Sequence, residues 1–162
     1  MAIYLNYNAK TPKGNVTAEG YEDWIEIHGM NFGVGRGISM EPGAVSNREA
    51  TRPSLSEITV SKPMCAASGG LFSQSVTGSE GVKVELHVVK TGGKKLEKYA
   101  VITLEDCMIS SYSVSASGSG KPQETISISY ARIEANLSHA DKTNKNPKNQ
   151  LVGYDLTTAK PL

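Results

Sequence analysis

Cysteine and the large aromatic residues are scarce in this sequence of 162 residues, which has two cysteines, one tryptophan and two phenylalanines. Neither Cys65 nor Cys107 belongs to a CxxC pair, so the sequence does not support a zinc site or a thioredoxin-type redox centre. We expect both thiols to be reduced and partly buried. The shortage of tryptophan and phenylalanine also argues against an aromatic binding platform, although seven tyrosines leave that possibility open.

A charge excess and long apolar runs are absent as well. Seventeen basic and sixteen acidic residues leave a formal charge of +1, whereas nucleic-acid-binding proteins usually carry a basic excess. No segment approaches the roughly 20 consecutive apolar residues of a membrane-spanning helix. The opening residues, MAIYLNYNAK, are too short and too alternating for the apolar part of a signal peptide. We therefore expect no nucleic-acid partner, no membrane insertion and a cytoplasmic chain whose export, if any, uses no cleaved signal.

The motifs of common catalytic and cofactor sites are missing or incomplete. The glycine-rich stretch that begins at Gly33 has Ile38 where a dinucleotide fingerprint requires its last glycine, and neither a P-loop nor a nucleophile elbow is present. The three histidines, His28, His87 and His139, have no partner at metal-ligand spacing. The sequence predicts no cofactor, no metal site and no enzyme activity.

What the sequence does contain is alternation of apolar and polar residues, which predicts β-strands. Period-two patterns cover residues 3–7, 21–32, 56–62, 82–90, 96–116, 123–137 and 150–156. In the segment 96–116 the apolar positions change parity, from Ile102 and Leu104 to Cys107 and Ile109, and the segment 123–137 shows a similar change. A bulge or bend would reconcile the two parities and let one strand serve two faces of a barrel or sandwich.

One helix and one domain complete the expected architecture. Pro63 suits a first helical position, where its missing N–H has no intrahelical acceptor to lose. Met64, Leu71, Phe72 and Val76 then recur at roughly helical spacing, so we predict a helix that begins at Pro63. The length suits a single domain over residues 1–162, and no linker divides it.

The most informative stretch is residues 33–54, GVGRGISMEPGAVSNREATRPS, which holds four glycines and two prolines. A compact domain does not need a structureless connection of this length, so we expect a functional loop or one that orders against a partner. Its arginines alternate with glutamates, which suits charge pairing across an interface, and its apolar residues can pack on a partner. We predict an intersubunit arm whose contact residues are Arg36, Met40, Glu41, Val45, Arg48, Glu49 and Arg52.

In the order of its segments along the sequence, the chain resembles the Hcp proteins, which are tube-forming and exported components of bacterial type VI secretion systems. The resemblance covers nearly the whole chain and depends on the order and spacing of its segments. These segments are Lys13-Gly14, Trp24–Gly33, the glycine-rich arm, Leu55–Lys62, the helix from Pro63, Tyr99–Ser111 with Ile102-Thr103-Leu104 and Ser110-Ser111, Gly118-Ser119-Gly120, and Gly153-Tyr154-Asp155-Leu156.

The resemblance implies a compact two-sheet β-barrel with one short α-helix and a long extended loop. It also implies hexameric rings that stack into a hollow tube, which a contractile sheath drives out of the cell behind a spike. Spike, sheath and baseplate proteins are then the implied partners, and small effector proteins can occupy the lumen. On this analogy the arm contacts a neighbouring subunit or ring, and Asn31 is a candidate lumen residue.

Three other interpretations remain. The chain could be a monomeric β-barrel module that binds a sugar or a peptide, a tail tube protein of the related phage type, or an enzyme. The lack of a nucleophile–base or metal constellation argues against the enzyme. The oligomeric state separates the tube subunit from the monomeric module, because a closed ring requires each copy to bind the next through different surfaces.

Overall fold

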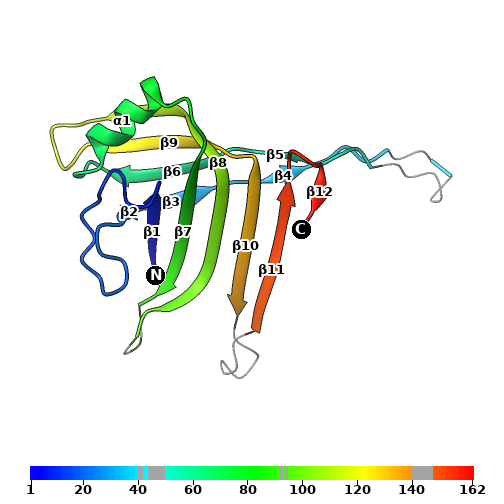
Figure 1. Cartoon of the computed structure of the whole chain (residues 1–162), viewed down its shortest axis with the longest axis horizontal. Helices are drawn as coiled ribbons and strands as arrows, with labels where there is room; N and C mark the ends of the chain where they lie inside the picture. The colour runs from blue at the N-terminus through cyan, green and yellow to red at the C-terminus, as the bar shows by residue number, and fades with distance from the viewer. Residues whose placement is uncertain (40–41, 44–49, 92, 94, 140–147) are drawn as a thin grey trace.

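Strands account for most of the computed structural model, which describes residues 1–39, 42–43, 50–91, 93, 95–139 and 148–162. The mainly β class with one short helix is confirmed (Figure 1). The strands are β1 (Ala2–Tyr7), β2 (Ile25–Ile27), β3 (Gly29–Asn31), β4 (Val34–Gly35), β5 (Ser54–Leu55), β6 (Ile58–Pro63), β7 (Val82–Lys90), β8 (Glu97–Ser115), β9 (Gln123–Ser129), β10 (Arg132–His139), β11 (Lys148–Asp155) and β12 (Lys160–Pro161). The helix α1 (Ser68–Thr77) lies between β6 and β7 in the chain.

Two antiparallel strand paths share the long strand β8. The first sheet runs β12-β11-β10-β8-β7-β1-β2, and the second sheet runs β3-β6-β9-β8. The sheets are open rather than closed into the compact barrel that the resemblance implies, because β10, β11 and β12 extend the first sheet beyond β8 as a wing with an edge of its own (Figure 1). Only Tyr154 and Asp155 of β11 pair with β12.

The bend in β8 lies at Asp106, whose φ of 53° is in the left-handed region. The ladder with β7 skips at this point, because Val84 pairs with Leu104 while Val82 pairs with Cys107. The extra residue turns the apolar side of the strand inward on both sides of the bend. The bulge expected from the change in parity is thus confirmed for β8.

The other two long patterns are each divided into two strands. Residues 123–137 contain β9 and β10, separated at Tyr130 and Ala131, so the change in parity there marks a break. Residues 21–32 contain β2 in the first sheet and β3 in the second, separated by His28, whose backbone N–H donates to the carbonyl of Ser61 at 2.8 Å. This segment therefore passes from one sheet to the other, as β8 does.

The main hydrophobic core lies between the inner faces of the two sheets. Its most deeply buried members include Ile25, Ile58, Leu86, Leu104 and Ile126. Burial of each such side chain contributes about 1.5–3 kcal/mol relative to an exposed position. A smaller cluster around Tyr21, Trp24 and Val89 lies apart from this core.

The helix begins at Ser68, so the prediction that it starts at Pro63 is wrong. Pro63 is the last residue of β6 and pairs with Gln123 of β9, because its fixed φ also suits the end of a strand. Within α1, Leu71 is 2% exposed and packs in the core, whereas Phe72 is 55% exposed. Of the four apolar residues that predicted the helix, only Leu71 is buried within it. Phe72 and Val76 are exposed, and Met64 lies before the helix begins.

Candidate assembly surfaces

The predicted arm is an antiparallel ribbon over the part of it that the structure describes. Val34 of β4 pairs with Leu55 of β5, and a further bridge joins Ile38 to Ala50. Between them, the N–H of Thr51 donates to the carbonyl of Gly37 at 2.8 Å. The ribbon protrudes from one side of the molecule, beyond the wing (Figure 1).

Two of the seven predicted arm residues fall within the described chain. Arg36 and Arg52 are both exposed on the ribbon, and neither forms an ion pair with another described residue. The other five lie outside the described residues; they are Met40, Glu41, Val45, Arg48 and Glu49. Charge pairing between the arm and a neighbouring subunit stays a prediction.

An apolar groove of about 480 Å³ lies where the wing meets the root of the arm. Phe32, Val34, Leu55, Leu137, Val152 and Tyr154 are among its lining residues. The groove leads into the core at Ile102 and Ile133, yet Val34 at its edge is 66% exposed. A continuous apolar surface of this kind on a folded chain usually marks an interaction site.

The outer face of the second sheet is lined with small polar residues, and we call it the hydroxyl face. One row crosses all four strands through cross-strand pairs, and its members are Asn31, Thr59, Ser127 and Ser111. The next row contains Gly29, Ser61, Thr125 and Ser113. Thr59 and Ser127 join their hydroxyl groups at 3.2 Å. These two rows carry no charged residue, which is unusual for an exposed sheet face.

The predicted lumen residue Asn31 is exposed at the end of the first row. Sequence reasoning missed the serine and threonine residues of both rows. Their signal is present in the sequence as serine or threonine at every second position of β6, β9 and the second half of β8. The strand register is needed to align these positions across the sheet.

A buried charged cluster fixes α1 to the inner side of the second sheet. Lys62 forms an ion pair with Glu124, and both side chains are closed to solvent. Ser68 of α1 donates its hydroxyl to Glu124 at 3.0 Å and accepts from Lys62 at 3.2 Å. Burial alone would raise the pKa of Glu124, but hydrogen bonds from Lys62, Tyr112 and Ser68 lower it overall. The Ser68–Lys62 contact could suit a nucleophile and its base, but a substrate has no access to it.

Both cysteines are free, as expected, and Cys65 also meets the expectation of partial burial. Cys107 is buried and Cys65 is partly buried. Burial raises the pKa of the Cys107 thiol to about 12. In the part of the chain that the structure describes, no three histidine, cysteine or acidic side chains come close enough to hold a metal ion. No helix formed by these residues has the length and apolar character needed to cross a membrane.

The family model described as "Type VI secretion system effector, Hcp" matches residues 4–137 of the chain. This chain belongs to the Hcp family. The assignment confirms the resemblance seen in the sequence. No match was found among curated protein sequences.

Solved structures of Hcp proteins share the fold. A structure described as a type six secretion system protein is 27% identical, has a TM-score of 0.88, and covers 99% of this chain and 99% of its own. Hcp1 from Salmonella typhimurium is 18% identical with a TM-score of 0.78, covering 99% and 98%. A type VI secretion system effector from Yersinia pestis is 16% identical with a TM-score of 0.73, covering 94% and 98%. The last two likenesses show the fold alone.

Proposed function

We propose that this Hcp protein is a structural subunit of the type VI inner tube, in which hexameric rings stack and are propelled out of the cell. The observation that carries the proposal is the second sheet. Among the described residues, β3 pairs only with β6, and β8 from Met108 onward pairs only with β9, so both edges of this sheet lack a strand partner. Unpaired edges are templates for pairing with another chain.

Edge-to-edge contact would make the ring heterologous, since β3 of one copy would meet β8 of the next. The two polar rows would then continue from copy to copy around an inner wall. In this arrangement the hydroxyl face, with Asn31 at its edge, lines the lumen. An uncharged hydrophilic wall suits the passage or shelter of small effector proteins.

The apolar surfaces support the same type of contact. The groove lies on the side of the wing and the arm, whereas α1, with exposed Phe72 and Val76, lies toward the opposite side of the subunit (Figure 1). A closed ring requires different surfaces on the two sides of each copy. Covering the groove with a neighbouring copy would remove Val34, Leu137 and Val152 from water.

The arm is assigned to contacts between subunits or between rings. Arg36 and Arg52 would act there together with Met40, Glu41, Val45, Arg48 and Glu49. In this proposal the chain folds in the cytoplasm before assembly and leaves the cell with the tube. Spike, sheath and baseplate proteins are its proposed partners, and its role requires no cofactor and no catalysis.

Electron microscopy and sedimentation velocity of the purified chain test the ring. Annular particles with a central hole are expected, and a strict monomer at tens of micromolar would contradict the proposal. It would favour a monomeric binding module instead.

Cysteine labelling then tests which face lines the hole. In a Cys65→Ser background, Ser127→Cys on the hydroxyl face is compared with Glu26→Cys, an exposed position on β2. Both should react with a small maleimide. A large polyethylene-glycol maleimide should label Glu26→Cys and be excluded from Ser127→Cys. Equal labelling by the large reagent would place the hydroxyl face outside the ring.

A further inference from the structure

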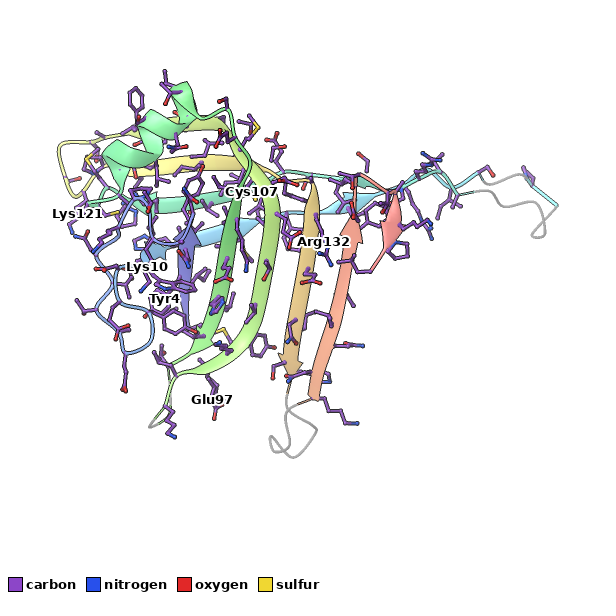
Figure 2. The ribbon with its side chains drawn as sticks, in the orientation of Figure 1. Tyr4, Lys10, Glu97, Cys107, Lys121 and Arg132 are labelled. Carbon is purple, nitrogen blue, oxygen red and sulfur yellow. The ribbon has the colours of Figure 1, made fainter. Side chains whose placement is uncertain are left out.

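A second cavity, of about 670 Å³, lies against the first sheet beside the smaller aromatic cluster. It is lined by the segment before β2, by His87 of β7, and by residues just before and at the start of β8. Tyr4 and Glu97, both labelled in Figure 2, mark this end of the subunit, which is distant from the arm. The volume lies within the roughly 300–1,000 Å³ that small-molecule pockets occupy. The proposed tube assembly does not use this cavity.

One wall of the cavity is a packed set of aromatic rings. Tyr21 and Trp24 meet edge to face with ring centroids 4.9 Å apart. The ring centroids of Trp24 and His87 are 4.7 Å apart. The hydroxyl of Tyr21 and Nδ1 of His87 are joined by a hydrogen bond of 3.1 Å. All three side chains are nearly buried, so the wall is held in place. Their exposed edges, together with the partly buried Leu96, leave an apolar surface against which a further ring can lie edge to face.

The other wall is cationic. Lys95 and Lys98 are exposed at the cavity, and neither forms an ion pair with any described residue. Glu19 is the one carboxylate among the described lining residues, so the cavity carries a net positive charge. Burial, followed by the positive charge of Lys98, lowers the pKa of His87, and the carboxylate of Glu85 opposes this shift.

We propose that this cavity binds a small organic anion that carries an aromatic or heteroaromatic ring. The ring would pack against Tyr21 and Trp24, and the acidic group would lie between Lys95 and Lys98. A neutral aromatic molecule would leave the ammonium groups without a partner. An aromatic cation would be repelled by them.

The single tryptophan of the chain is Trp24, so its fluorescence reports directly on the cavity. Three probes with the same ring separate the effect of charge, since a nitro group quenches tryptophan. They are 4-nitrobenzoate, 4-nitrobenzyl alcohol and 4-nitrobenzylammonium. We expect saturable quenching by the benzoate and much weaker quenching by the alcohol and the ammonium compound. Added salt should weaken the binding of the benzoate.

Variants assign the effect to the two lysines. Lys95→Met with Lys98→Met should weaken 4-nitrobenzoate binding about ten-fold, as expected for two partly screened charge contacts. Lys121→Met, which removes an exposed lysine at another part of the surface, should leave it unchanged. Lys98→Glu should reverse the preference toward 4-nitrobenzylammonium.

Three results would overturn the proposal. They are no saturable quenching by the benzoate, equal quenching by the uncharged alcohol, and unchanged affinity in the double lysine variant. Circular dichroism of each variant checks that the fold is retained. The preference reversal in Lys98→Glu tests charge selection by a gain of binding, which unfolding cannot produce.

Discussion

The ammonium of Lys62 and the carboxylate of Glu124 face each other across neighbouring strands, and both side chains are completely removed from solvent. Tyr112 also donates its hydroxyl to Glu124, and Ser68 bonds to both members of the pair. The desolvated charges are thus compensated by hydrogen bonds, which a buried ion pair requires in order to be tolerated. The pair connects β6, β8, β9 and α1.

Removing one member of this pair should be strongly destabilising. Glu124→Gln leaves the buried ammonium of Lys62 without a countercharge, and we expect it to lower the free energy of unfolding by about 3–5 kcal/mol. Lys62→Met combined with Glu124→Leu should cost less, because no charge is left unpaired. Urea unfolding at one protein concentration measures both variants.

A surface ion pair provides the control. Nζ of Lys83 lies 3.1 Å from Oε1 of Glu85, and the side chain of Lys83 is 60% exposed. Lys83→Met should therefore change stability by less than about 1 kcal/mol. A loss in Glu124→Gln no larger than in Lys83→Met would contradict the structural role given to the buried pair.

Acid should weaken the fold through His87. Its pKa is lowered from the ordinary 6.5 mainly by burial and then by Lys98, while Glu85 opposes the shift. The unfolded chain therefore binds a proton more readily, so this contribution to stability is complete above pH 6.5 and declines below it, by at most about 1.4 kcal/mol per pH unit. His87→Gln should reduce this decline. Urea midpoints measured across the acid range for both proteins provide the test, and parallel pH profiles would reject it.

The bend in β8 predicts an unusual response to substitution at Asp106. Its φ of 53° is readily adopted by glycine but not by a β-branched residue. We expect Asp106→Gly to be nearly neutral and Asp106→Val to lower the free energy of unfolding by about 1–3 kcal/mol. Thr103→Val, in the extended part of the same strand, is the control. In thermal unfolding, the Tm of Asp106→Val should be well below that of Asp106→Gly and Thr103→Val.

The arm predicts an effect on assembly without an effect on folding. Arg36→Ala with Arg52→Ala should weaken the association of subunits or rings, because both charges are exposed on the ribbon and lack an ion-pair partner among the described residues. Lys83→Ala with Lys98→Ala removes the same charge from the outer side of the first sheet, which the proposed contacts do not use. Sedimentation velocity should distinguish the two double variants while their circular dichroism agrees. If both double variants assemble equally well, the two arginines do not contribute to the interface.

Alternation in the sequence was sufficient wherever one strand stays in one sheet. Residues 82–90 were predicted to be a strand and form β7 with those bounds. Val84 and Leu86 face the main core as the alternation predicts, whereas Val89, of the opposite parity, packs in the smaller cluster after a register shift. The change in parity also located the bend in β8 near Asp106. The strands β2 and β3 were taken as one. The crossing between sheets occupies only His28, and the single Gly29 that follows it can equally lie inside one continuous strand pattern.

Features that depend on distant residues could not be predicted in the same way. The hydrogen-bond role of Ser68 depends on Glu124, 56 positions later in the chain, so the local pattern favoured Pro63 as the helix start. The rows of the hydroxyl face depend on strand register, and serine and threonine alone are equally typical of loops. The apolar groove exists because the sheets stay open, which no local pattern of residues encodes.

One continuous strand, β8, fixes the angle between the hydroxyl face and the wing. Two irregularities of the backbone lie between these parts, the left-handed residue Asp106 and the register shift between Ile109 and Ser111. In a closed ring the turn made by each copy is repeated until the circle is complete, and any error is multiplied by the number of copies. The diameter of the proposed tube would thus depend on the torsion angles of a few residues of β8.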